Sequence, residues 1–204
     1  MDALKLALTE AQKQAENAFD PERKTRFEKV TAELVRYMDN LNDVSRLMKE
    51  RDLKVAELVS FQKQVESKLE KRLSEATDVT QYRAELADAT LVFKALTQEG
   101  TEYLLTNNER DYQQFESKLD EWKLYLTQLG YVNQEQLNAL TDSFANSLSQ
   151  VAVLIRERNA RWDVLKEIGF DISEQINGIK TDAVNDQNVA LLLKSMELNL
   201  EATI

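Results

Sequence analysis

The apolar residues of this chain recur every three or four positions over two unusually long stretches, from Glu22 to about Ala76 and from Asn133 to about Lys180. This spacing places them on one side of an α-helix and predicts two long amphipathic helices. The first stretch would be a rod about 80 Å long, at roughly 1.5 Å per residue. The two apolar stripes consist of Phe27, Val30, Leu34, Tyr37, Val44, Leu47, Leu58, Phe61, Val65 and Leu69, and of Phe144, Val151, Leu154, Leu165, Ile168, Ile172, Ile176 and Ile179.

Turn residues around these stretches predict four shorter helices. Asp20 and Pro21 can cap and begin the first long helix, the run 106–108 (Thr-Asn-Asn) supplies a turn, and Asn133 begins a pattern typical of a capping box. We therefore expect an all-α fold of six helices, two long and four short. The short helices would cover residues 2–18, 79–105, the segment from the turn at Asn108 to Gly130, and residues 189–202.

The amino-acid composition favours helices and excludes most kinds of catalytic site. The 204 residues include only four Gly and one Pro, and neither Cys nor His. Without Cys and His the chain lacks thiol nucleophiles, the usual zinc ligands, serine–histidine triads and the Glu-x-x-His motif of diiron sites. We therefore expect no catalytic residues, no metal site and no cofactor, and we do not expect an enzyme.

The charge balance argues against nucleic acid as a partner. The chain has 26 Lys and Arg against 36 Asp and Glu, and its net charge of −10 repels phosphate backbones and anionic lipid. No run of about 18 apolar residues occurs, so we expect contact with a membrane only through segments outside this sequence. The absence of cysteine suits a reducing cytoplasm and a bacterial periplasm equally well.

The two long helices match each other at a constant offset. Arg51 and Arg158 lie 107 positions apart (158 − 51), and the polar run 49–51 (Lys-Glu-Arg) aligns with 156–158 (Arg-Glu-Arg). Because 107 is not a multiple of seven, heptad spacing alone does not produce this match. The sequence therefore predicts an internal duplication with a period of 107 residues, in which residues 183–204 align with 76–97 and both chain ends fall inside repeat units.

An arginine interrupts each apolar stripe near its middle. Arg51 and Arg158 occupy positions that the seven-residue register otherwise fills mainly with Val or Leu, and Lys54 and Arg161 follow at the next inward spacing. A guanidinium buried without a partner is costly, so an anionic group should face each arginine. These arginines are the sharpest candidates for a functional site.

Three hypotheses account for the arginines. A small organic anion could bind the planar guanidinium fork inside a helical bundle, with Arg51, Arg158 and Arg161 as contacts. Glu50, Glu157 or acids of the short helices could instead form an internal salt-bridge layer. Finally, a straight helix departs from a seven-residue repeat by about 60° over three heptads, which would turn the arginines toward solvent.

Several short motifs of the chain occur together in one known family. They are Tyr103-Leu104-Leu105 with the polar turn after it, Tyr37-x6-Val44, Phe144-x6-Val151 and Gly169. With them the chain resembles the helical bimodular ligand-binding domains of bacterial chemoreceptors, the methyl-accepting chemotaxis proteins, and of related sensor kinases. The resemblance implies two stacked four-helix bundles, formed by two long helices that both bundles share and by four short ones.

The resemblance also implies a function. Members bind small ligands such as organic acids on the periplasmic side of the bacterial inner membrane and pass a helix displacement to a cytoplasmic signalling module. The implied partner is a small carboxylate or amino acid, and a homodimer is compatible with it. The family often has an Arg six residues before the Tyr, where this chain has Thr97, and Asn199 lies in the matching region of the last helix. Both are lesser candidates for ligand contacts.

We therefore expect residues 1–204 to form one elongated sensor domain in which a small polar ligand binds between helices and biases their sliding. The competing hypothesis is a spectrin-like structural scaffold in the cytoplasm with no small-molecule ligand, which the Trp162 region would suit. The core is predicted at Leu47, Leu58, Val65, Val151, Leu154, Leu165 and Ile172, together with the aromatic stripe Tyr112, Phe115 and Trp122.

Overall fold

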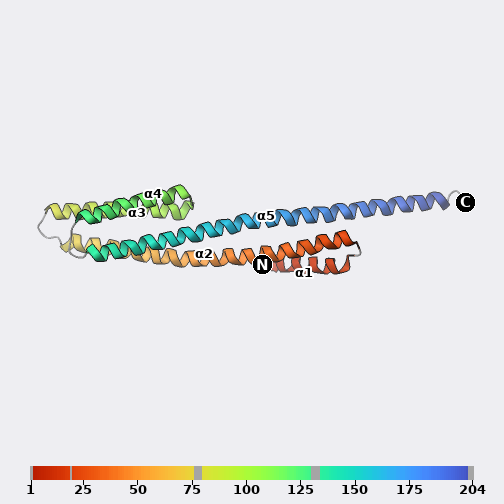
Figure 1. Ribbon diagram of the computed structural model, residues 1–204, viewed down its shortest axis with the longest axis horizontal. Coiled ribbons are helices and arrows are strands. Elements are labelled where there is room, and N and C mark those ends of the chain that lie inside the picture. The colour runs from red at the N-terminus through yellow and green to blue at the C-terminus, as the bar shows by residue number, and fades with distance from the viewer. Residues whose placement is uncertain (1, 19, 76–79, 130–133, 202–204) are drawn as a thin grey trace. The chain divides into compact units, whose positions relative to one another are not determined.

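The computed structural model describes residues 2–18, 20–75, 80–129 and 134–201, with side chains for all of them except 2–3, 80–82, 128–129, 134 and 188–201 (Figure 1). The described residues form α-helices and short turns, so the prediction of an all-α fold is confirmed. The helices are α1 (Asp2–Asn17), α2 (Pro21–Glu75), α3 (Thr80–Thr106), α4 (Glu109–Leu129) and α5 (Gln134–Glu201). Over the described residues, none of them has a stretch long and apolar enough to cross a bilayer.

The prediction of six helices was wrong, because the part of the chain that the structure describes has five. The second long helix does not end near Lys180. It continues through residues 181–188 into the segment expected to form a separate short helix, so that α5 is 68 residues long. This stretch contains Asp and Asn, which favour turns, but neither Pro nor Gly, so no backbone hydrogen bond is lost and the helix runs on.

The predicted caps at the other helix starts are confirmed. The Asp20 carboxylate accepts a hydrogen bond from the Glu22 amide at 2.9 Å, and the Asn108 side-chain oxygen accepts one from the Arg110 amide at 3.0 Å. Between α3 and α4, Asn107 adopts a positive φ of 53°, a conformation that Asn tolerates better than most residues. The capping box predicted at Asn133 lies outside the described residues.

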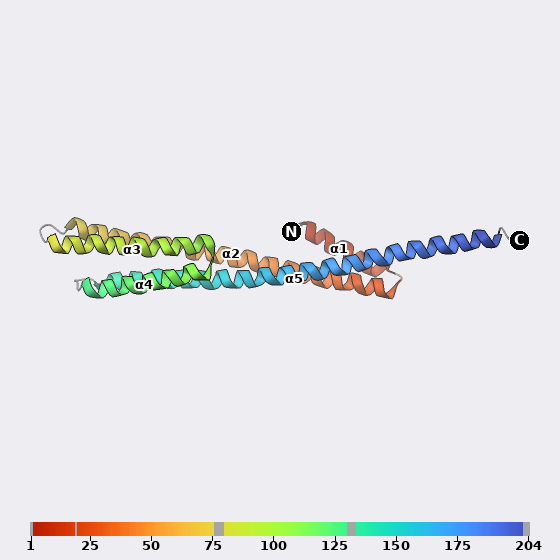
Figure 2. The ribbon, with the colours of Figure 1, turned by 90° about the horizontal axis from the view of Figure 1, so that it is seen from above.

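The chain divides into two compact units, each of which contains part of α2 and part of α5. Unit 1 comprises Met1–Ser45 and Asn159–Ile204, and unit 2 comprises Arg46–Arg158. In unit 2, the α3–α4 hairpin lies along the parts of α2 and α5 that belong to this unit (Figures 1 and 2). All four segments contribute to one core, so unit 2 is a helical bundle.

Aromatic side chains fill the centre of the unit 2 core. Phe93 of α3 lies 5.2 Å from the Trp122 ring of α4 and 5.9 Å from the Phe144 ring of α5, measured between ring centroids. The Trp122 indole nitrogen donates a hydrogen bond to the Thr141 hydroxyl at 2.9 Å, so its one polar atom is satisfied inside the core. The predicted aromatic stripe of α4 is thus confirmed as a core face.

Unit 1 has a smaller core built from three helices. It contains Ala11 of α1 and Val30 and Leu34 of α2, and Ile172 and Ile179 of α5 pack against it. Ion pairs extend this packing along α5, since Arg26 binds Asp182 at 3.1 Å and Arg23 binds Asp186. Among the side chains that the structure describes, no fourth helix joins this core, because the expected last helix is part of α5.

Most of the predicted core is confirmed. Leu47, Leu58, Val65, Val151 and Leu165 are buried. By contrast, Leu154 and Ile172 are only partly buried. Ile172 packs against the smaller core of unit 1, whereas Leu154 lines an open cleft described below.

The helix bounds bear on the proposed duplication without deciding it. Adding 107 to Asp2, the first residue of α1, gives Glu109, the first residue of α4. The break between α2 and α3 has no counterpart, however, because α5 is continuous at residues 183–186. The duplication stays a prediction.

Two glycines of α5 in unit 1 provide a matched test of this packing. A Cβ at Gly169 would meet nothing within 4 Å, whereas one at Gly178 would lie 2.4 Å from the Arg26 guanidinium. Because Gly disfavours a helix, Gly169→Ala should raise the free energy of unfolding by about 0.5–1 kcal/mol. Gly178→Ala should raise the free energy of unfolding by less than this, or lower it, since the new methyl group pushes the Arg26 side chain away from Asp182. Urea denaturation measures both, and equal gains would contradict the packing of Arg26 on α5.

Candidate functional site

Unit 2 brings together the two arginines that occupy equivalent positions in the predicted repeat. Burial lowers the pKa of the Arg158 guanidinium below its ordinary value, and the positive charge of Arg51 lowers it further. Tyr103 acts in the opposite direction, so its phenol lies near the same layer. The charges of Arg51 on α2 and Arg158 on α5 are thus close enough to repel each other, near a tyrosine of α3. We call Arg51, Arg158 and Tyr103 the arginine layer.

The arginine layer is only weakly neutralised on its α2 side. Arg51, whose side chain is 27% exposed, donates to the carboxylate of its neighbour Asp52 from Nη2 at 2.6 Å and from Nε at 3.1 Å. Asp52 is well exposed to solvent, and ion pairs with an exposed partner contribute little. Glu50, which the salt-bridge hypothesis named as a partner for the arginines, instead binds Arg46 at 3.0 Å.

A third arginine nearby has a different, structural environment. Arg156 makes a two-pronged contact with Glu109, at 2.6 and 3.1 Å, and its guanidinium lies 5.1 Å from the centre of the Tyr112 ring. The hydrogen bond to Glu109 raises the pKa of Arg156, so this cation is satisfied within the fold. The ion pair between Arg156 and Glu109 thus links α5 to the first residue of α4.

Tyr103 of α3 lies near the two arginines on the side of the α3–α4 hairpin, and Tyr112 of α4 lies beside it. Tyr103 is buried and its ring lies 5.2 Å from the ring of Tyr112. Burial raises the pKa of the Tyr103 phenol, while the positive charge of Arg156 lowers it. The phenol is therefore a neutral hydrogen-bonding group at physiological pH.

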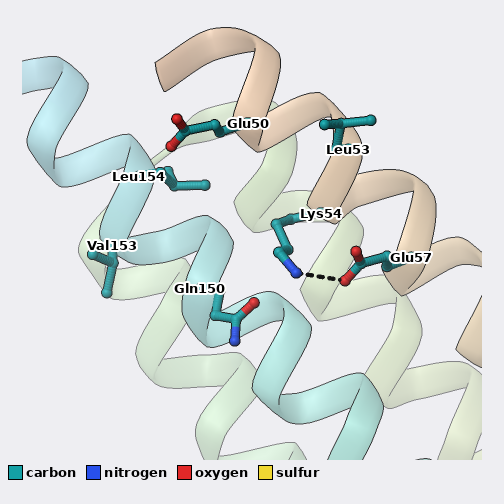
Figure 3. A pocket seen from close by; sticks show the side chains of 7 residues that line it. All are labelled: Glu50, Leu53, Lys54, Glu57, Gln150, Val153 and Leu154. Atoms are coloured by element: carbon teal, nitrogen blue, oxygen red, sulfur yellow. Dashed lines mark hydrogen bonds and ion pairs between the residues drawn. The ribbon is translucent and has the colours of Figure 1, made fainter. Parts of the chain in front are cut away.

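An open cleft of about 570 Å³ lies between α2 and α5 in unit 2 (Figure 3). Its apolar surface includes Leu53, 67% exposed, and Val153, 46% exposed. At one end the Glu50 carboxylate points toward Leu154, as Figure 3 shows. The full lining consists of Glu50, Leu53, Lys54, Glu57, Gln150, Val153 and Leu154.

The cleft and the arginine layer follow each other along the same two helices. Since Glu50 lies by Leu154 and Glu57 by Gln150, α2 and α5 run in opposite directions here. Arg51 directly follows Glu50, and Arg158 lies one helical turn beyond Leu154 on the same side of α5. Arg51 thus lies beside Glu50 on the way to Leu53, Arg158 lies beyond Leu154, and neither arginine is among the residues that line the cleft. The end of the cleft opposite Glu50 is occupied by Lys54, which binds Glu57 at 2.8 Å.

The remaining predicted site residues lie elsewhere. Arg161 belongs to unit 1, where its exposed side chain binds Asp43 at 3.3 Å, so the expected inward position was wrong for this residue. The drift of a straight helix away from a seven-residue repeat explains this placement. Thr97 is buried in α3, and its hydroxyl donates to the Lys94 carbonyl at 2.9 Å. Asn199 is among the residues whose side chains lie outside the described part.

Sequence analysis missed the cleft itself. Its signal was present in Leu53 and Val153, two apolar residues that do not belong to the predicted stripes. A pattern search discards such residues because single exposed apolar side chains are common on protein surfaces. Elsewhere in the described part of the chain, no group of acidic side chains is arranged to hold a metal ion.

No protein-family model matches this sequence, and a search of curated proteins finds no match. The resemblance to helical bimodular domains therefore stays a prediction from short motifs, and the functional argument depends on the geometry of unit 2.

Proposed function

We propose that this chain is a helical sensor domain that binds a small carboxylate ligand through Arg51 and Arg158. The supporting observation is that the two arginines, from α2 and α5, lie close enough for the charge of Arg51 to add to burial in lowering the pKa of Arg158, near the buried Tyr103. A carboxylate between them offsets the repulsion, and each guanidinium can donate two parallel hydrogen bonds to it.

Binding of such a ligand can also change the arrangement of α2 and α5 and thereby transmit a signal. It contacts α2 and α5 together, so it favours the arrangement of the two helices in which both arginines reach it. Differential affinity of this kind shifts a conformational equilibrium, and small helix displacements are a known form of the response.

The motif resemblance supplies the proposed context. In it the chain is the ligand-binding part of a bacterial chemoreceptor or sensor kinase on the periplasmic side of the inner membrane. The ligand is a small organic acid or amino acid.

Isothermal titration calorimetry with a panel of mono-, di- and tricarboxylates and amino acids tests this function. The best ligand should bind Arg51→Ala and Arg158→Ala at least about tenfold more weakly than the unmodified chain, because hydrogen bonds to charged groups contribute about 1.5–3 kcal/mol each. Arg161→Ala, an exposed arginine of unit 1, is the matched control and should bind normally. Absence of any carboxylate ligand, or an equal loss in all three variants, would overturn the proposal.

The exposed apolar side chains of the cleft favour one alternative. Leu53 and Val153 could pack against a partner helix, which suits a spectrin-like interaction scaffold in the cytoplasm. Under that alternative no small carboxylate binds, and Leu53→Ser disrupts a protein complex without affecting the arginines.

A further inference from the structure

Within the described part of unit 1, one side of α5 lacks a covering helix. The predicted repeat aligns this part of α5 with the part of α2 that belongs to unit 2, so the two can be compared position by position. Leu69 of α2 is fully buried, whereas Ile176, its counterpart in α5, is 39% exposed. A Cβ added at Gly169, seven residues before Ile176, would meet nothing within 4 Å. We call the side of α5 that holds Gly169 and Ile176 the open side.

The last part of α5, residues 189–201, matches the helix that covers α2 in unit 2. We call these residues the terminal segment. Three buried residues of α3 have apolar counterparts in it, 107 positions later in the chain. The α3 residues are Leu86, Ala89 and Phe93, and the counterparts are Leu193, Met196 and Leu200. The terminal segment thus has the apolar spacing of the helix that unit 1 lacks.

The terminal segment cannot reach the open side of its own α5. In unit 2, α2 ends at Glu75 and α3 begins at Thr80, and the counterparts of these residues are Asp182 and Gln187. Between these two positions α5 is an unbroken helix. It runs on past the start of α2 (Figures 1 and 2), and a continuous helix does not fold back along itself. The helix that covers the open side therefore has to come from another molecule.

We propose that the chain forms a domain-swapped homodimer, in which the terminal segment of each copy packs on the open side of α5 in the other copy. The two α5 helices run antiparallel and cross at residues 183–186, which align with the connection between α2 and α3. Val184, 55% exposed in the single chain, lies at this crossing. Exchange of identical elements is a low-cost route to a dimer, and its two-fold symmetry makes each contact twice.

The area of this exchange is sufficient for a specific dimer. The terminal segment is a helix about 20 Å long and 10 Å wide, and half of its lateral surface together with the surface it covers comes to about 600 Å². Two such contacts bury about 1,200 Å², which is the lower end of the range for specific protein interfaces. The residues that meet are apolar on both sides, so their burial favours association.

Size-exclusion chromatography with light scattering tests the dimer. The full chain should have twice the 23.5 kDa mass of one copy. Ile176→Asp and Leu193→Asp should each weaken the dimer at least about tenfold, because each puts a carboxylate into the apolar contact. Val35→Asp is the matched control and should dimerise normally, since Val35 is similarly exposed, at 43%, but lies on α2. The mass of one copy at every protein concentration, or a dimer that neither α5 substitution weakens, would overturn the proposal.

Cross-linking tests where the two copies cross. The chain has no cysteine, so Val184→Cys gives each copy a single thiol. A short bismaleimide should join two copies through this position, because neighbouring helices pack about 8–10 Å apart. Val35→Cys is the control and should not be joined. A dimer in which Val184→Cys copies are not joined would overturn the exchange, because the copies would then associate through another surface.

Discussion

Replacing Trp122 by alanine should lower the free energy of unfolding by about 3–5 kcal/mol, the range for large aromatic side chains removed from a core. Trp122 is fully buried at the centre of unit 2, where its ring packs against Phe93. The variant leaves a cavity among aromatic rings and removes the hydrogen bond partner of the buried Thr141 hydroxyl. Urea denaturation followed by circular dichroism measures the change.

The second tryptophan of the chain is the natural control for this experiment. Trp162 lies in unit 1 and is 41% exposed, so Trp162→Ala should cost less than about 1 kcal/mol. A Trp162→Phe variant additionally leaves Trp122 as the single tryptophan fluorophore, and its emission should be that of a buried indole until the chain unfolds. Equal losses of stability in the two alanine variants would contradict the description of the unit 2 core.

Replacing Arg158 by methionine should abolish binding of the carboxylate ligand and change the free energy of unfolding only slightly. Because the pKa of Arg158 is lowered by burial and by Arg51, the folded chain holds this proton less firmly than the unfolded chain does. The positive charge of Arg158 is therefore less favourable in the folded chain than in the unfolded chain, while a methionine of similar length keeps the apolar packing of the side-chain stem. We expect the free energy of unfolding to change by less than about 1 kcal/mol.

Arg156→Met provides the contrast, since this residue lies two positions away on α5. Its guanidinium is satisfied by Glu109 and packs over Tyr112, so its loss should lower stability by about 1 kcal/mol and leave ligand affinity unchanged. Thermal unfolding with and without ligand distinguishes the two variants. If Arg158→Met were the strongly destabilised one, the arginine layer would be a structural feature of the bundle.

The helices could be predicted because local signals agree with the final structure. The Asp20 cap, the turn at Asn107 and the apolar stripes all act within a few residues, and each gave an element boundary within a residue or two. The continuation of α5 could not be predicted, because Asp and Asn at 181–188 favour turns without requiring one.

Only part of the candidate site could be predicted from the sequence. The seven-residue register identified Arg51 and Arg158 because they interrupt apolar stripes, and in the structure the charge of Arg51 lowers the pKa of Arg158. Their role in ligand binding stays a prediction. The same register failed for Arg161, since a helix with 3.6 residues per turn gradually rotates away from it. The cleft depends on how α2 and α5 pair in space, and this pairing leaves no periodic signal in either helix.

The most direct test of the carboxylate site is the nuclear magnetic resonance signal of the arginine side chains during a ligand titration. We predict that the Nε–Hε signals of Arg51 and Arg158 shift together as the tightest-binding carboxylate of the calorimetric panel is added, and that the signal of Arg161 does not. Saturating ligand that moves neither Arg51 nor Arg158, or that moves Arg161 alone, would contradict the account.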